Sequence, residues 1–417
     1  MLLNQTPFSS SVRLLRGAAL AVLTAATLSC EVTSAPEGDR DIAIGGLFSL
    51  TGNWATLGVT SKAALELAVA DVNAAYAGSG LHFTADVADT KLDPQIALTQ
   101  ATELRARGVQ IIIGPQSSAE LAVLKPYVDA NPVLIVSQSS TAGTLAVAGD
   151  NIFRLTPADT LEGVAAAALM YNDGVRSVVP IWRGDAGNRG LHTSTQLEFG
   201  LLGGTTSTGI EYAATATNFT APVSTVSTQV RAAIAQVGAN RVGVYLAAFD
   251  EVVDVFVAAS ADPVLSTVRW YGTDGVALSG PILASAAAVA FATKVGYPNP
   301  IFGLSDARKD VWGPIAARIQ AQAKVEPDAF ALGVYDAVWL AAAAYAASPR
   351  PATIDQLRAR FVAATGSHNG TTGWTVLNAA GDRKFADFDF WSIVKDASGT
   401  RWVRTAQYDT QLKVLTR

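Results

Sequence analysis

The sequence predicts an α/β protein with two similar lobes, each built on a parallel β-sheet. Apolar runs of strand length alternate with longer stretches that carry apolar residues at helical spacing. Because the strands are continuous apolar runs, helices are expected to cover the sheet on both faces. The first set of expected strands covers 42–47, 82–87, 110–113 and 133–136, and the rhythm restarts with 177–181, 207–212, 241–246 and 268–271.

Helices are expected between these strands and in the last third of the chain. The helix that opens at Pro94 has its proline in the first turn, where proline is well tolerated. The first set covers 56–76, 94–107 and 119–130, and the second covers 190–202, 221–237 and 250–260. The tail adds helices at 308–322, 330–346 and 354–363 and a strand-like piece at 388–394.

Composition excludes several classes of protein. The 417 residues are half hydrophobic and 16% charged. That is enough for two or three domains with real cores, and it excludes a disordered chain. The formal net charge is −5. An acidic chain is poorly suited to binding nucleic acid over a broad surface, so no nucleic-acid partner is expected.

Metal and disulfide chemistry are not expected. Cys30 is the single cysteine, so no intrachain disulfide and no cysteine metal cluster can form. The three histidines, His82, His192 and His368, lie far apart without paired ligand spacing. The prediction is therefore no metal and no cofactor.

The first 29 residues are predicted to be an export signal. Arg13 and Arg16 precede the uncharged run 17–29, which is shorter than the roughly 20 residues of a bilayer span. The run ends in Leu-Ser-Cys at Cys30, similar to a bacterial lipoprotein cleavage box. Cys30 is expected to be the lipidated first residue of the mature protein, and the alternative is an incidental cysteine in an ordinary signal peptide. The polar residues 30–40 would be the tether, and no later run reaches 18 uncharged apolar residues.

Hydroxyl side chains follow two successive strands of the first set. Ser117 and Ser118 come after 110–113, and Ser139, Ser140 and Thr141 come after 133–136. Ligands of open parallel sheets bind at the carboxyl ends of the strands, and N–H groups at helix N-termini suit an anion such as a carboxylate. Plain helix capping is the better explanation of either cluster alone, but two clusters that end successive strands favour a binding site, because their donors would converge on one point.

An acidic residue ends a strand of the second set. Asp274 follows 268–271 in the turn Gly-Thr-Asp-Gly. Asp274 is either a turn former or a carboxylate facing the cleft. In the second case, hydroxyls on one lobe and an acid on the other match the zwitterion of an α-amino acid.

Apolar side chains at strand ends are candidates for the pocket wall. Trp54 and Leu57 lie in the expected loop after the first strand, Trp182 follows 177–181, and Phe249 follows 241–246. The alternative is that they only pack the lobes together.

These stretches together resemble the branched-chain amino-acid (leucine/isoleucine/valine)-binding proteins of ABC importers. The similarity covers nearly the whole mature chain, and IIIGPQSSAELAVLKPYVDANPVLIVSQSSTAG is its most specific part. The other matching stretches are GLFSLTGNWATLG, IFRLTPAD, RWYGTDG, FALGVYDAVWLAAAA and TTGWTVLNAAGDRKF.

The resemblance implies a type I periplasmic binding protein fold, with two Rossmann-like lobes joined by a three-segment hinge. The first lobe would comprise 41–157 and about 300–368, and the second 158–299 and about 369–417. By position, Ser117 and Thr141 would bind the ligand carboxylate with their hydroxyls, and Ser139 and Ser140 would contribute backbone groups. Asp274 would hold the ammonium.

The family's pocket residues map onto this chain with one departure. Leu57 and Phe249 fall at positions that shape the side-chain pocket. Gly187 stands where the family often has a tyrosine, so either Trp182 fills that space or the pocket is larger. The disulfide usual in the first lobe is absent.

The expected function is that of a substrate-binding protein in the bacterial cell envelope, periplasmic or otherwise extracytoplasmic, lipid-anchored through Cys30. Its expected partners are an amino acid, branched-chain or otherwise apolar, an ABC permease and the membrane through the anchor, and we expect a monomer. The alternatives are a small amide, urea or carboxylate ligand, or a sensory ligand receptor.

Catalysis is not expected. The chain has no Gly-x-Ser-x-Gly elbow of a serine hydrolase. Gly184, Gly187 and Gly190 do not form a phosphate loop, because the Gly-Lys-Ser/Thr ending is missing.

Overall fold

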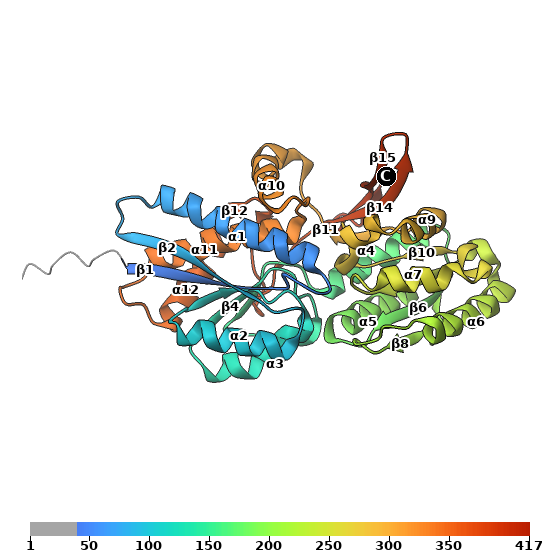
Figure 1. Cartoon of the computed structure of the whole chain (residues 1–417), viewed down its shortest axis with the longest axis horizontal. Helices are drawn as coiled ribbons and strands as arrows, with labels where there is room; N and C mark the ends of the chain where they lie inside the picture. The colour runs from blue at the N-terminus through green and yellow to red at the C-terminus, as the bar shows by residue number, and fades with distance from the viewer. Residues whose placement is uncertain (1–39) are drawn as a thin grey trace, which may run out of the picture. The chain divides into compact units, whose positions relative to one another are not determined.

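Five parallel strands form the first sheet, in the spatial order β2-β1-β3-β4-β5 (Figure 1). The structure, a computed structural model, describes residues 40–417. The predicted export signal, Cys30 and the tether as far as residue 39 lie outside the described residues. The strands are β1 (Arg40–Phe48), β2 (Leu81–Asp89), β3 (Ile111–Ile113), β4 (Leu134–Ser137) and β5 (Ile152–Arg154).

Helices cover both faces of the first sheet because its strands place apolar side chains on both. Ile111 and Ile113 belong to a core shared with α1, α11 and α12, whereas Ile112 belongs to a core shared with α2 and α3. We call this sheet and its helices the first lobe. The helices are α1 (Ala55–Ala75), α2 (Pro94–Ala106), α3 (Ser118–Ala130), α10 (Lys309–Ala323), α11 (Ala329–Ala346) and α12 (Ile354–Thr365).

The second sheet repeats this arrangement, with parallel strands in the order β10-β9-β6-β7 and β8 also beside β6. Val179 and Ile181 share a core with α6, α7 and α9, and Val178 shares one with α4 and α5. We call this sheet and its helices the second lobe. Its strands are β6 (Ser177–Arg183), β7 (Thr205–Thr206), β8 (Ile210–Tyr212), β9 (Val242–Ala247) and β10 (Arg269–Tyr271). Its helices are α4 (Asp159–Asn172), α5 (Ala186–Leu201), α6 (Thr220–Val237), α7 (Val252–Ser260), α8 (Gly280–Ala284) and α9 (Ala286–Val295).

Two smaller sheets are antiparallel. The strands β11 (Asn299–Phe302), β14 (Phe388–Asp396), β15 (Gly399–Asp409) and β16 (Val414–Thr416) pair in that order, and β12 (Asn369–Gly370) pairs with β13 (Gly373–Trp374). Five short 3₁₀ turns complete the described chain: η1 (Gly143–Leu145), η2 (Ala239–Arg241), η3 (Pro263–Ser266), η4 (Asp274–Val276) and η5 (Asp306–Arg308).

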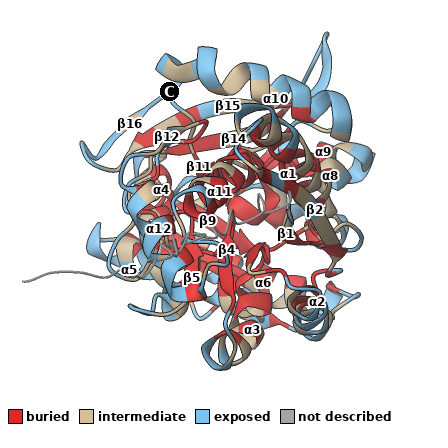
Figure 2. Ribbon diagram, turned by 90° about the vertical axis from the view of Figure 1, so that its left-hand side faces the viewer, coloured by how far each residue is buried: buried red, intermediate tan, exposed pale blue. Residues whose placement is uncertain are grey.

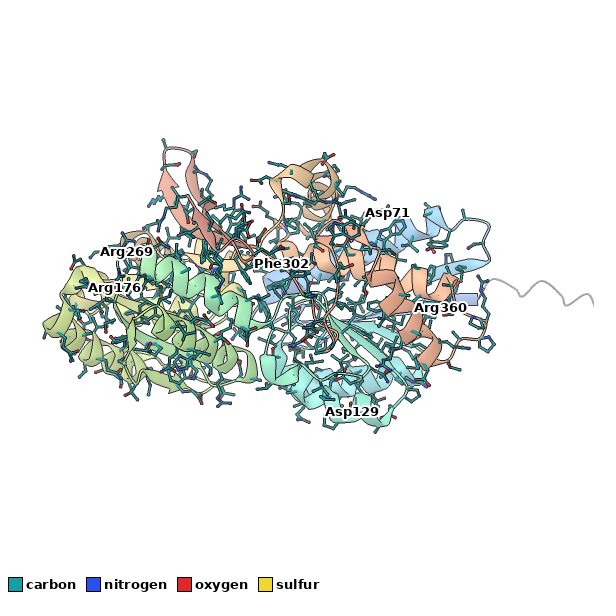
Figure 3. All side chains as sticks on the ribbon, turned by 180° about the vertical axis from the view of Figure 1, so that it is seen from behind. Asp71, Asp129, Arg176, Arg269, Phe302 and Arg360 are labelled. Carbon is teal, nitrogen blue, oxygen red and sulfur yellow. The ribbon has the colours of Figure 1, made fainter. Side chains whose placement is uncertain are left out.

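The chain passes between the lobes at three places. It runs from β5 to α4, through β11 to α10, and through residues 375–387 into β14. Phe302 marks the second crossing in Figure 3. Beyond this crossing, α10 is held to α1 by an ion pair between Arg318 and Asp71 at 2.7 Å. The predicted α/β class with two parallel-sheet lobes is confirmed, whereas the predicted lobe bounds stay a prediction.

The strand order fixes where loops from both sheets can meet. In the first sheet β1 lies between β2 and β3, and in the second sheet β6 lies between β9 and the pair β7 and β8. Connections leave such a central strand and its neighbour toward opposite faces, which opens a crevice at their carboxyl ends. Figure 2 shows buried residues at β4 of the first sheet and β9 of the second, and both strands are buried along their length.

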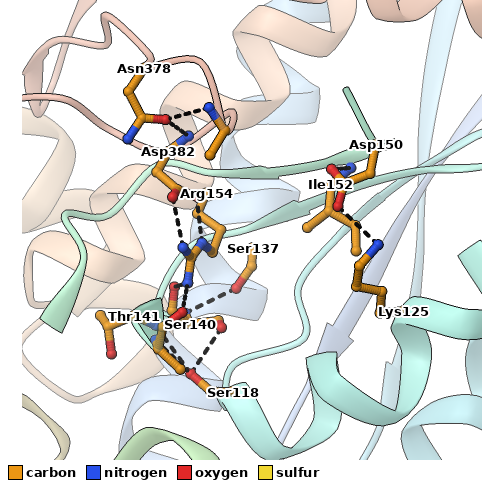
Figure 4. A network of polar contacts seen from close by, with 12 residues as sticks. Ser118, Lys125, Ser137, Ser140, Thr141, Asp150, Ile152, Arg154, Asn378 and Asp382 are labelled. Atoms are coloured by element: carbon orange, nitrogen blue, oxygen red, sulfur yellow. Dashed lines mark hydrogen bonds and ion pairs between the residues drawn. The ribbon is translucent and has the colours of Figure 1, made fainter. Parts of the chain in front are cut away.

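A buried ion pair ties β5 to the third crossing. Arg154 donates from Nε to Asp382 Oδ1 at 2.5 Å and from Nη2 to Oδ2 at 2.7 Å, and both side chains are almost fully buried (Figure 4). Arg154 Nη1 also donates to the carbonyl of Ala142 at 2.6 Å. The same guanidinium therefore fixes the loop that follows β4.

Within residues 40–417, α11 is the helix whose length and apolar composition would allow it to cross a membrane. However, 83% of its apolar window is buried inside the protein. It is accordingly a core helix packed against α1, as its place in the first-lobe core shows.

The buried pair predicts a clear difference between two aspartate substitutions. Asp382→Ala should lower the free energy of unfolding by about 3–5 kcal/mol, because it leaves the Arg154 charge buried and unpaired. Asp86→Ala, which removes a largely exposed pair with Arg107, should change stability little. Urea unfolding of both variants measures this, and equal stabilities would contradict it.

Candidate functional site

Residues from both lobes enclose a small cavity at the carboxyl ends of their strands. Its enclosed volume is about 10 Å³, roughly the room that one water molecule needs. It is lined by Trp54, Ser117, Ser118, Ser139, Thr141, Gly187, Asn188, Leu191, Phe249 and Asp274. Loops that follow β1, β3, β4, β9 and β10 thus meet where the strand order places a crevice.

The structure brings most of the predicted site residues to this one cavity. Hydroxyl-bearing residues of the first lobe stand on its wall together with an aspartate of the second lobe and two aromatic rings. These residues are Trp54, Ser117, Ser139, Thr141, Phe249 and Asp274. Ser140, Leu57 and Trp182 do not line it.

Ser117 lies on the cavity wall as the N-cap of α3. Its hydroxyl accepts from the Glu120 N–H at 3.2 Å and its own backbone N–H donates to Glu120 Oε2 at 2.9 Å, which forms a capping box. The Ser117 hydroxyl also donates to Glu120 Oε2 at 2.6 Å. Ser139 donates its hydroxyl to the carbonyl of Gln116 at 2.9 Å. The serines therefore do cap and brace the loops, and the cavity lies at the N-terminus of α3, where N–H groups carry partial positive charge.

The aromatic wall joins the two lobes. The ring of Trp54 stacks on Phe249 with centroids 4.7 Å apart, and it meets Phe330 edge-on at 6.2 Å. The backbone N–H of Trp54 donates to Asp250 Oδ2 at 2.7 Å, and the side-chain Nδ2 of Asn53 donates to Glu251 Oε2 at 3.1 Å. Residues after β9 thus hold the loop that follows β1.

Ser140 and Leu57 support the cavity from behind. The Oγ atoms of Ser140 and Ser118 lie 3.0 Å apart, and Ser118 Oγ accepts the N–H of Thr141 at 3.2 Å (Figure 4). Leu57 belongs to the first turn of α1 instead of the expected loop, because that helix begins at Ala55. It packs in the same apolar cluster as Trp54.

Trp182 lies on β6 away from the cavity. Its ring stacks on His192 of α5 at 3.9 Å, and its indole N–H donates to Glu211 at 2.9 Å. It therefore does not fill the space at Gly187, where a cavity-lining Leu191 from the next turn of α5 stands nearby. The sequence predicted the position of Trp182 at a strand end, but it could not predict the direction of the side chain.

Two acidic residues behind the cavity were missed by the sequence analysis. Glu162 Oε1 accepts the N–H of Asp274 at 3.2 Å, and Glu162 and Asp159 both belong to the first turns of α4. Asp159 is 1% exposed, and the Thr141 hydroxyl lies beside its carboxyl, which no basic side chain of the described chain binds. The signal available in the sequence was that Asp159 and Glu162 follow closely after the first crossing between the lobes.

Burial changes the acidity of this carboxyl cluster, which we define as Asp159, Glu162 and Asp274. Desolvation is the main cause in each case. It raises the pKa of Asp274 to about 7 and the pKa of Asp159 to about 8. It raises the pKa of Glu162 well above its usual range, and the charges of Asp274 and Asp159 add to the effect.

A glycine of α5 makes room for the carboxyl cluster. A Cβ atom on Gly190 would lie 1.9 Å from Asp159 Oδ2. Gly163 of α4 likewise faces the backbone of α5, since its Cβ would lie 2.7 Å from the carbonyl carbon of Ser194. The two helices approach closely at these glycines, which places the first turn of α4 against the cavity.

Among residues 40–417, no group of three or more His, Cys, Asp or Glu side chains has the arrangement of a metal site.

Comparison with known proteins identifies relatives of this fold. A family model described as "Receptor family ligand binding region" matches residues 60–396. An uncharacterized protein of Methanocaldococcus jannaschii is 26% identical over 395 residues, covering 90% of this chain and 92% of the relative.

Solved structures match the described chain over both lobes. The branched-chain amino acid transporter substrate binding protein LivJ from Streptococcus pneumoniae, in complex with isoleucine, has a TM-score of 0.69 at 19% identity, covering 88% of this chain and 100% of that one. A solute binding protein from R. palustris in complex with benzoate has a TM-score of 0.70 at 17% identity, covering 88% and 96%. The predicted type I periplasmic binding protein fold is confirmed.

The contact of Gly190 with Asp159 predicts the effect of adding a methyl group. Gly190→Ala should lower the free energy of unfolding by about 1–3 kcal/mol, because the buried carboxylate must move. Gly200→Ala lies on the same helix with nothing within 4 Å of its added Cβ, and it should be neutral or stabilising by up to about 1 kcal/mol. Thermal unfolding of the pair checks this; indistinguishable variants would refute the close contact.

The raised pKa of Asp159 predicts a pH dependence of stability. The folded protein keeps a proton on Asp159 up to about pH 8, whereas the unfolded chain loses it near its ordinary value of 3.8. Stability of the ligand-free protein should therefore fall as pH rises between these values, by at most about 1.4 kcal/mol per pH unit from this group. Asp159→Asn should flatten the dependence.

Denaturant unfolding from pH 5 to pH 8 measures that slope. Asp129→Asn, a substitution at an exposed aspartate paired with Lys125, is the control and should keep the parent slope. An Asp159→Asn variant that keeps the parent slope would show that this carboxyl is ionised in the folded protein.

Proposed function

This chain belongs to the family described as "Receptor family ligand binding region". From that premise we propose that it is the extracytoplasmic substrate-binding protein of an ABC importer. Its ligand is an amino acid with a branched-chain or other apolar side chain, held between the two lobes. The observation that carries the proposal is one cavity with hydroxyls and a helix N-terminus on one wall and Asp274 on the other.

The polarity of the cavity supports a zwitterionic ligand. The ligand carboxylate is placed against the first-lobe wall, where Thr141 and the N-terminus of α3 supply donors. Its ammonium group is placed against Asp274, and a charge-assisted hydrogen bond removed from water is worth about 1.5–3 kcal/mol. Opposite charges on the two ends thereby fix the orientation of the ligand.

The lining of the cavity supports an apolar side chain. Its enclosed volume of about 10 Å³ is far below the roughly 300–1,000 Å³ of typical ligand pockets, so the lobes must separate to admit an amino acid and then close around it. Trp54, Phe249 and Leu191 supply the apolar surface. The solved relative LivJ holds isoleucine, a ligand of the proposed class.

One observation favours a second candidate ligand. Because burial raises the pKa of Asp274 to about 7, a protonated Asp274 is able to donate a hydrogen bond to a neutral amide or to a carboxylate. The relative from R. palustris holds benzoate, a carboxylate without an ammonium group. A small amide, urea or carboxylate is therefore the alternative, with transport or sensory reception as its use.

The cellular setting follows from the same proposal. Ligand binding would favour the closed arrangement of the lobes, which presents a joint surface to the permease. We place the protein outside the cytoplasm as a monomer, anchored by lipid at Cys30, with lobes bounded as the sequence predicts.

The test combines a ligand panel with two aspartate variants. Calorimetry with apolar amino acids, small amides and organic acids should show tightest binding for an amino acid. Asp274→Ala should weaken that binding by roughly 10- to 100-fold, the loss of one charge-assisted bond, while Asp129→Ala at an exposed site should bind as the parent does. Unchanged affinity of Asp274→Ala would refute the ammonium assignment, and tighter binding of an amide would favour the second candidate.

A further inference from the structure

The proposed zwitterion site uses Asp274 but leaves two buried acids of α4 without a role. Glu162 lies against Asp274, whose N–H it accepts, and Asp159 lies beside Thr141 of the first-lobe wall, whose carbonyl accepts the Asp159 N–H at 2.9 Å. An α-ammonium group carries one positive charge and needs one carboxylate. The other two acids therefore require their own explanation.

Glu162 contacts Asp274 at two points. Its Oε1 accepts the Asp274 N–H at 3.2 Å, and the two carboxyl groups also lie within hydrogen-bonding range of each other. Two ionised carboxylates in contact repel each other, and burial prevents water from screening them. One proton between them turns the repulsion into a hydrogen bond, because a protonated carboxyl donates to a carboxylate.

The surroundings add negative charge to this pair more than positive charge. Asp159 acts on Glu162 from α4, and Asp328 acts on Asp274 from the N-cap of α11. Asp185, the N-cap of α5, acts on Asp159. Within the described chain, the positive charge of Arg154 acts on Asp159 of this cluster, but its guanidinium is already bound to Asp382.

Asp159 shows the same shortage of positive charge. Its carboxyl is buried, with the Thr141 hydroxyl beside it and no basic side chain of residues 40–417 bound to it. A buried carboxylate without a cation is costly, and a proton removes that cost.

We propose that Glu162 is a specificity-determining residue of the site: it holds a proton against Asp274 while the cavity is empty, and that proton passes to solvent when a cationic group of the ligand binds Asp274. This inference rests on the proposed function and sharpens it. A ligand with an ammonium group exchanges its charge for the proton. Neutral amides and simple carboxylates carry no such charge, so they leave the proton in place.

The acidity of the pair agrees with this exchange. Burial, followed by the charge of Asp274, raises the pKa of Glu162 well above its usual range, which favours a proton on the Glu162–Asp274 pair. A cation against Asp274 lowers the pKa of both acids. Protons and ligand cations compete, so affinity for an amino acid should fall as pH falls.

The test counts protons. Calorimetry at pH 7.5 with L-leucine, or with the tightest-binding amino acid of the panel, is run in two buffers of different ionisation enthalpy. The parent should release close to one proton more than Glu162→Gln, in which the amide donates to Asp274 without a titratable proton. The parent's affinity should also fall more steeply than the variant's between pH 8 and pH 6.

Asp159→Asn is the matched control, since it removes the neighbouring carboxyl and keeps the pair. It should release within half a proton of the parent. Amino acid binding without proton release, or release that disappears in Asp159→Asn and persists in Glu162→Gln, would overturn the role of Glu162 and leave the proposed function intact. If Glu162→Gln folds poorly, the number of protons that the parent releases decides whether binding displaces a proton. Failure of every amino acid to bind would overturn both proposals.

Discussion

The burial of three carboxyl groups where the lobes meet is the constraint on which this site depends. Asp159, Glu162 and Asp274 lose most of their hydration there, and Arg154, whose charge acts on Asp159, is bound to Asp382. Removing carboxylates from water is costly unless a proton or a cation neutralises them. The local structure accommodates the groups themselves, as the missing side chain at Gly190 shows, but it does not supply the neutralising charge. A buried cluster of this kind contributes little to the stability of the protein. It instead makes the site favourable for a positively charged partner.

The fold determines why these groups meet at one cavity. Both sheets have a central strand whose neighbours are connected across opposite faces, so the crevice lies at the carboxyl ends. Arg154 adds precision, because one guanidinium binds Asp382 and also the carbonyl of Ala142 in the loop after β4. Contacts from Trp54 and Asn53 to residues after β9 close the opposite side. The position of the site is thus set by topology, and its shape by a few polar contacts that cross between distant segments.

Strand rhythm predicted the two sheets because continuous apolar runs have few alternatives in a soluble chain of this size. Position at a strand end was enough to bring Ser117, Thr141 and Asp274 to one cavity, since carboxyl ends of parallel strands converge. It could not give side-chain direction, so Trp182 faces α5 instead, stacked on His192. Asp159 and Glu162 escaped prediction because acids in the first turn of a helix are usual there for electrostatic reasons. Only the close approach of α4 and α5 at glycines reveals that they lie beside the ligand cavity.

The serine next to the cavity shows that capping and binding are not alternatives. Ser117 has a single hydroxyl proton, and it is donated to Glu120 at 2.6 Å. A ligand carboxylate that uses this hydroxyl must therefore replace Glu120 as its acceptor, and Glu120 is itself fully buried. Displacing one buried carboxylate by another gains little, because the abandoned acceptor loses a hydrogen bond that water cannot restore. Thr141 and the N–H groups at the start of α3 are the more favourable donors to an incoming anion. Ser117 then contributes by holding that helix start in place, so the hydroxyl that looks most like a ligand contact acts mainly through the backbone it caps.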